Sequence, residues 1–149
     1  MFETYSHLRH KYPNISLYQE RRLIKQAQGG SKVKRKELVE RHIHFVIFRI
    51  NKIVFPAYRK RFGEDILSEA IFILYDKIET YDLRYKDKCN NSKPVRFSSY
   101  IWKRIDGFII DYLKKELNRE RQERSLDLGR PDYENDALVH EELYKESCC

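Results

Sequence analysis

Residues 31–53, SKVKRKELVERHIHFVIFRINKI, carry the clearest fold signal in the chain. Apolar side chains recur there at the spacing i, i+4, i+7, i+11 and i+14, namely Val39, Ile43, Val46, Ile50 and Ile53. This spacing aligns them on one side of an α-helix, whereas a β-strand would show strict alternation. The stretch therefore predicts a long helix with one buried face, capped by Ser31 and ended by Pro56.

Three further stretches share this period and predict three more helices. Their expected bounds are Ser16 to Gly29-Gly30, about Glu64 to Thr80, and Ser98 or Ser99 to about Glu123. A basic link, AYRKRFG (57–63), is expected before the third helix, and a basic loop (84–96) before the fourth. Helices joined by short connections predict an all-α fold, a compact bundle of about four to five helices.

The charge is unevenly distributed along the 149 residues, whose formal net charge is +7. Residues 125–149 contain seven acidic side chains against Arg130 and Lys145, a net charge of −5, which leaves +12 on the preceding residues. We expect an N-terminal extension (1–15), a helical domain (16–124) and a weakly structured acidic tail (125–149). A basic body favours anionic partners, nucleic acids among them.

Several classes of protein are not indicated by the sequence. The three cysteines form no C-x-x-C pair, and no apolar run approaches the roughly 18 residues of a membrane span, so we expect a reducing, cytoplasmic location without a membrane partner. His42 and His44 lie about 200° apart on a helix and cannot share a metal. No phosphate-binding glycine loop, nucleophile elbow or catalytic carboxylate pair is present, so we expect no cofactor, no metal and no enzymatic activity.

The fourth predicted helix begins with RFSSYIWKRIDG (96–107) and has two faces. Trp102 lies at the edge of the apolar stripe and is interpreted as structural. The opposite face gathers Tyr100, Lys103, Gly107, Ile110 and Lys114, with Arg104 and Asp111 at its edge. Such a face can bind nucleic acid, because rings stack on bases, cations contact phosphates and a glycine permits close approach. Alternatively, Tyr100 and Trp102 pack on the third helix and Gly107 marks a close helix crossing.

The third predicted helix carries an acidic stripe with an apolar residue, Phe72, in its middle. The acidic members are Asp65, Glu69, Asp76 and Glu79. One interpretation is an ordinary solvated helix face. The other is a docking surface for a basic partner, because an exposed phenylalanine among carboxylates suits an interface.

Four ordered blocks of this sequence resemble region 2 of bacterial sigma-70 class sigma factors, together with the helix that leads into it. The blocks are ISLYQERRLIKQAQGG (15–30), KRKELVERHIHFVIFRI (34–50), DILSEAIFILYDKIETYD (65–82) and RFSSYIWKRIDGFIIDYLKKE (96–116). The last block is most similar to the flagellar and sporulation branch of the family, and short phage late-transcription factors have a similar overall shape.

The resemblance implies a docking role for the third helix. In the family, this helix binds a basic coiled coil of the β′ subunit of core RNA polymerase. The matching or adjoining positions here are Asp65, Ser68 (in place of the usual Gln), Glu69, Phe72, Asp76 and Glu79.

The resemblance also implies that the fourth helix captures and melts the promoter −10 element. Tyr100 matches the position whose ring stacks on the flipped adenine of the non-template strand. The implied DNA-binding residues are Arg96, Phe97, Tyr100, Lys103, Arg104, Gly107, Ile110 and Lys114. The family's Trp-Trp pair falls here on Lys103 and Arg104, so charge would replace the aromatic wedge.

Nothing after Arg124 resembles the region that reads the −35 element. The segment DALVHEELYKE (136–146) is interpreted as a docking peptide for a second sigma-like protein or a clamp-type factor. Three functions stay open: a sigma-like initiation factor, a polymerase-binding co-sigma or decoy without autonomous promoter recognition, and a general basic nucleic-acid-binding module.

Overall fold

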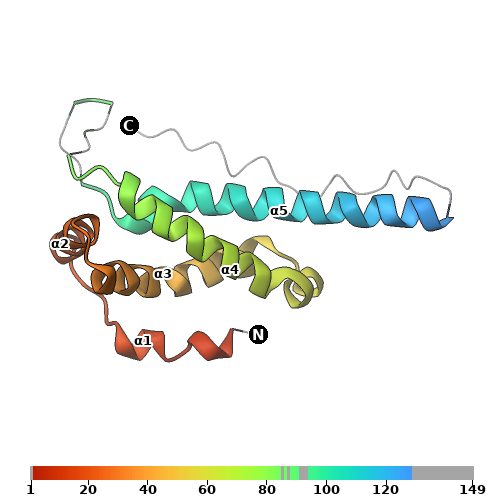
Figure 1. The fold of residues 1–149 in the computed structure, drawn as a ribbon, viewed down its shortest axis with the longest axis horizontal. Helices are drawn as coiled ribbons and strands as arrows, with labels where there is room; N and C mark the ends of the chain where they lie inside the picture. Colours follow the sequence, from red (N-terminus) through yellow and green to blue (C-terminus); the bar gives the residue numbers. More distant parts are fainter. Residues whose placement is uncertain (1, 85, 87, 91–93, 129–149) are drawn as a thin grey trace.

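The predicted all-α class is confirmed. A computed structural model of the protein describes residues 2–84, 86, 88–90 and 94–128, the last two by their backbone alone. Its elements are a 3-10 turn η1 (Glu3–Tyr5), α1 (Leu8–Lys11), α2 (Leu17–Gln28), α3 (Lys32–Ile53), α4 (Pro56–Thr80) and α5 (Phe97–Leu128) (Figure 1). No strand occurs among these residues, and none of their helices has the length and apolar character needed to cross a membrane.

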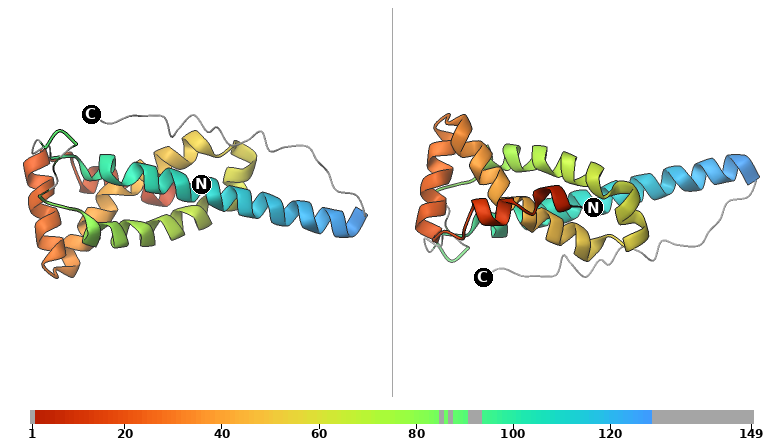
Figure 2. Two further views of the ribbon diagram at one scale, coloured as in Figure 1. Left: turned by 90° about the horizontal axis from the view of Figure 1, so that it is seen from above. Right: turned by 90° about the horizontal axis from the view of Figure 1, so that it is seen from below.

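Helices α3, α4 and α5 pack on one another, and α2 lies crosswise at one end of the group (Figure 2). The C-terminal part of α5 extends beyond the other helices. At the crossing, the Gln28 amide on α2 donates hydrogen bonds to the carbonyls of Ile78 (2.9 Å) and Tyr81 (2.7 Å) at the end of α4. Helix α2 therefore satisfies carbonyl groups that the last turn of α4 leaves without partners.

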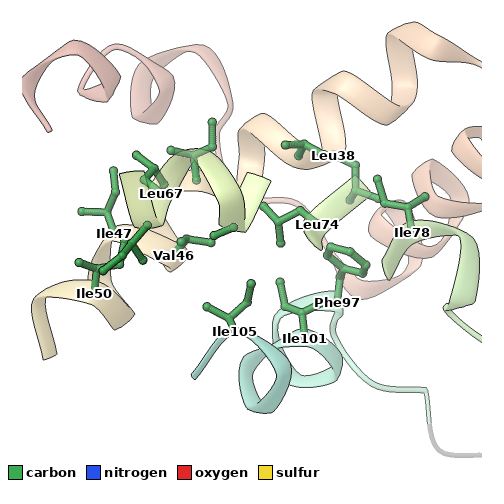
Figure 3. Packing of buried hydrophobic residues seen from close by; sticks show 14 of the residues in the cluster. Leu38, Val46, Ile47, Ile50, Leu67, Leu74, Ile78, Phe97, Ile101 and Ile105 are labelled. Atoms are coloured by element: carbon green, nitrogen blue, oxygen red, sulfur yellow. The ribbon is translucent and has the colours of Figure 1, made fainter. Parts of the chain in front are cut away.

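The predicted apolar stripe of α3 forms the centre of the core (Figure 3). Val46 and Ile50 are fully buried, as are Leu74 and Ile78 on α4 and Ile101 on α5. Burying such side chains stabilises a fold by about 1.5–3 kcal/mol each. The core therefore fixes which faces of α4 and α5 remain at the surface.

The predicted signals at the ends of α2 and at the start of α3 are confirmed. Ser16 Oγ accepts a hydrogen bond from the Gln19 amide, and the Gln19 side chain accepts one from the Ser16 amide, which together form a capping box. Gly30 adopts φ +101° after α2, a conformation that glycine tolerates best. Ser31 Oγ then accepts from the Lys34 amide to begin α3.

The expected start of the third predicted helix, at about Glu64, is wrong. Helix α4 begins at Pro56, so the AYRKRFG segment (57–63) is helical rather than a link. Proline suits the first helical position, because its missing N–H would have no partner there. The Phe62 ring is buried and packs edge-on against Tyr112 at 6.1 Å, which draws this early turn into the bundle.

Both expected ends of the fourth predicted helix are also wrong. Helix α5 begins at Phe97, before Ser98 and Ser99, and it ends at Leu128 rather than near Glu123. The helix therefore crosses the boundary expected at residues 124/125. The remainder of the predicted acidic tail, including 136–146, lies outside the described residues.

The expected N-terminal extension contributes to the bundle. Leu8 on α1 is 5% exposed and belongs to the core cluster. The Tyr12 hydroxyl donates to Glu40 Oε2 at 2.6 Å, and His44 Nε2 lies 2.8 Å from the Tyr5 carbonyl. These contacts hold residues 2–15 on α3.

Candidate functional site

The predicted docking residues share one exposed face of α4. All six are exposed, namely Asp65, Ser68, Glu69, Phe72, Asp76 and Glu79. We call this set the acidic face. Phe72 is 71% exposed, although a side chain of this size is usually at least half covered in a folded domain.

Most carboxylates of the acidic face are available to an external cation. Asp65, Glu69 and Asp76 form no ion pair with any described residue, whereas Glu79 pairs with Arg35 at 3.1 Å. Partial burial raises the pKa of Tyr112 on α5, and the charges of Asp65 and Glu69 act in the same direction.

Tyr100 lies in an aromatic cluster at the start of α5 and is half-buried. Its hydroxyl oxygen lies 2.8 Å from Thr80 Oγ1. Its ring meets Tyr81 edge-on at 5.3 Å, and Lys77 Nζ lies 5.4 Å from the ring centroid. These contacts combine the two interpretations drawn from the sequence, because the ring packs on α4 and also keeps part of its surface exposed.

Helix α5 brings together the predicted cations on one face. Lys103, Arg104 and Lys114 are exposed, and Gly107 lies half-buried among them. None of the three cations forms an ion pair with a carboxylate in the described part of the chain. We call these four residues, together with Tyr100, the basic face.

Two residues predicted to contact DNA are buried, which corrects their expected placement. Phe97 has no exposed surface, and Ile110 is 4% exposed. The Phe97 ring packs against His42 at 4.9 Å and Tyr81 at 6.1 Å. Asp106, Ile109 and Ile110 are all buried, so the buried sector of α5 is wider than one apolar stripe. The reason is that α5 packs on both α3 and α4.

Arg96 is half-exposed, and its guanidinium group forms hydrogen bonds within the helical bundle. Arg96 Nη1 donates to the Ile15 carbonyl at 2.8 Å and to Glu20 Oε2 at 3.3 Å. Glu20 Oε1 in turn accepts from the Phe97 amide at 2.6 Å. Arg96 therefore helps position the start of the basic face.

A buried ion pair beneath the basic face gave no signal in the sequence. Arg49 Nε donates to Asp106 Oδ1 at 2.8 Å, and Arg49 Nη2 donates to Asp106 Oδ2. The Arg49 guanidinium lies 5.8 Å from the centroid of the Trp102 ring, and Lys103 Nζ lies 5.5 Å from that centroid. Trp102 is half-buried, so its ring links the buried pair to the exposed Lys103.

His42 is buried, and its ring forms a hydrogen bond within α3. His42 Nδ1 lies 2.7 Å from the Leu38 carbonyl, which fixes the proton on that nitrogen. Burial lowers the pKa of His42 below its usual value, against the opposing effects of this bond and of Glu20. Over the residues that the structure covers, no group of three or more His, Cys, Asp or Glu side chains could hold a metal ion.

Compared with known proteins, the chain matches no family model, no curated protein and no solved structure. The relation to sigma factors therefore stays a prediction from the four sequence blocks.

Proposed function

We propose that this protein is a sigma-like transcription initiation factor. It binds core RNA polymerase through the acidic face of α4. It recognises and opens the promoter −10 element through the basic face of α5.

One observation carries this proposal. The acidic face presents three carboxylates without described partners around the exposed Phe72, on a chain whose net charge is +7. A net-basic protein that keeps such a patch unpaired has a surface complementary to a basic partner element. The β′ coiled coil to which the family resemblance points is an element of that kind.

The basic face supports the second half of the proposal. Lys103, Arg104 and Lys114 supply phosphate contacts, and the half-exposed Tyr100 ring supplies a surface for one unpaired base. Stacking on a ring and capture in a pocket offset the few kcal/mol that unpairing a base costs. The polymerase and the DNA would therefore occupy different helices of the same bundle.

The proposal is tested by binding to purified core polymerase at micromolar protein and moderate salt. We expect the full chain to bind, and we expect Asp65→Lys combined with Glu69→Lys to abolish binding. Asp65→Lys alone is compared with Glu64→Lys, which makes the same change of charge, because Glu64 is exposed on α4 about 100° from Asp65. Absence of binding by the wild-type chain, or equal loss in the control, would overturn the proposal.

A second candidate function is a co-sigma or decoy that binds polymerase but does not open DNA. It is favoured by the restraint on Tyr100, whose hydroxyl is hydrogen-bonded to Thr80 and whose ring packs on Tyr81. Run-off transcription separates the two functions. A sigma-like factor supports specific initiation with core polymerase alone, whereas a co-sigma or decoy changes transcription only when a second sigma-like protein is present.

A further inference from the structure

An open hollow lies between α2 and the turn that follows α4, and none of its described lining residues belongs to the two faces defined above. Its volume is about 800 Å³. It is lined by Tyr18, Arg21, Arg22, Lys25, Gln26, Leu83 and Arg84. We propose that this hollow binds single-stranded nucleic acid, with its cations on phosphates and Tyr18 stacked on a base.

The charged side chains among the described residues that line the hollow are all cationic. They are Arg21, Arg22, Lys25 and Arg84. Arg22, Lys25 and Arg84 form no side-chain ion pair with any described residue. Four cations around one concave surface focus a positive potential, which raises the local concentration of anionic ligands.

Arg21 has a structural role within the hollow. Its Nη2 donates to the Leu83 carbonyl at 2.5 Å, which joins α2 to the turn after α4. This bond engages a neutral acceptor, so the positive charge of Arg21 is not neutralised. The contact joins the two walls of the hollow.

Tyr18 distinguishes a nucleic-acid strand from a simple anion. The residue is 75% exposed at the wall of the hollow, although burying its ring would normally be favourable. A free phosphate makes no use of an exposed ring, whereas an unpaired base stacks on it. Bases in a duplex keep their faces covered, so the ring and the cations together fit a single strand.

Tyr81 connects the hollow to Tyr100. Leu83 follows two residues after Tyr81, and the Tyr81 ring meets Tyr100 edge-on. A strand unpaired at Tyr100 would reach the hollow at the same end of the bundle. This continuity rests on the proposed function, but binding in the hollow does not.

The test uses the full chain, without polymerase, and a fluorescent dT20 oligonucleotide in an anisotropy titration. We expect Tyr18→Ala to weaken binding roughly five-fold or more, and Tyr18→Phe to retain it. We expect Arg22→Ala combined with Lys25→Ala to weaken binding and to reduce the salt slope by about 1.4, since each phosphate contact contributes about 0.7. The control is Lys52→Ala combined with Lys60→Ala, which removes the same charge from exposed sites at the α3–α4 connection.

Crosslinking locates the bound strand. Irradiation of the complex with an oligonucleotide carrying 4-thiothymidine, followed by mass spectrometry, should place the adduct on α2 or on the Leu83–Arg84 turn. Equal weakening by both double variants, or no effect of Tyr18→Ala, would overturn the proposal. Competition by a polyglutamate peptide as effective as that by dT20 would also overturn it, in favour of an acidic protein ligand. Because polymerase is absent, failure here is distinguishable from failure of the proposed function.

Discussion

Glu20 on α2 accepts a hydrogen bond from the backbone amide of Phe97, at 2.6 Å and across 77 residues of sequence. The amide belongs to the first turn of α5, where N–H groups have no partner within the helix. The carboxylate is 6% exposed and also receives Arg96 Nη1. A side chain from one helix thus caps the start of another, and its negative charge interacts favourably with the α5 dipole.

Replacement of Glu20 should destabilise the bundle. Glu20→Ala leaves the buried Phe97 amide without an acceptor, so we expect the free energy of unfolding to fall by about 1–3 kcal/mol. Glu20→Gln keeps an acceptor oxygen and should cost less. Urea unfolding measures both, with the exposed Glu64→Ala as a control that should lie within about 0.5 kcal/mol of wild type. Equal stability of Glu20→Ala and Glu64→Ala would contradict a capping role.

The buried pair of Arg49 and Asp106 predicts strong asymmetry between single and double substitutions. Asp106→Ala leaves the guanidinium buried without its counter-charge and should cost about 3–5 kcal/mol. Arg49→Met combined with Asp106→Leu removes both charges and should be far less destabilising, because neither desolvation penalty remains. Thermal unfolding of the single and double variants checks this. A double variant that is less stable than Asp106→Ala would refute the prediction.

The burial of His42 predicts a loss of stability in mild acid. Its folded pKa is lowered below the ordinary 6.5, mainly by burial, so the unfolded chain binds the proton more readily. The contribution of neutral His42 to the free energy of unfolding is therefore complete above about pH 6.5, and it is lost as the pH falls towards the folded pKa. Glu20, Arg41 and Arg96 also act on this ring.

His42→Asn supplies the measurement for this pH dependence. Asparagine cannot titrate, so the decrease in unfolding free energy between pH 7.5 and 5.5 should be smaller than in wild type. Chemical unfolding at a series of pH values gives both slopes. Identical slopes would show that other groups cause the acid sensitivity.

Tyr100 should affect promoter opening without affecting attachment to polymerase. Tyr100→Ala removes the stacking ring and should impair open-complex formation by roughly five-fold or more, whereas core binding should be unchanged. Tyr100→Phe keeps the ring and loses only the contact with Thr80, so opening should be retained. Permanganate footprinting of the −10 element and a parallel core-binding titration provide the readouts. A parallel loss of core binding would contradict the assignment.

The helical period of the sequence predicted most of the fold because it reflects local geometry. The stripe through Val46 and Ile50 is buried as expected, and Ser16 and Ser31 cap their helices. In the sequence, Pro56 indicates only the end of one helix. It also begins the next, because proline is compatible with a first turn.

The site was less predictable because its contacts are distant in sequence. Glu20 and Phe97 are 77 residues apart, and Arg49 and Asp106 are 57 apart, so no local spacing indicates either pair. Ile110 falls beside Lys103 on a helical wheel, yet it is buried. The width of the buried sector of a helix depends on how many other helices pack against it. The period of apolar residues in the sequence does not give that number.

The crosswise position of α2 has a consequence for the order of folding. Gln28 completes the end of α4, and Glu20 completes the start of α5, so one short helix closes both ends of the connection between them. The contact between Glu20 and Phe97 closes a loop of 77 residues. The chain entropy is lost before the contact can stabilise the structure, which places this step late in folding. Slow hydrogen exchange at the Phe97 amide would then report complete assembly of the bundle, and a chain trimmed at residue 31 would lose protection at both helix ends together.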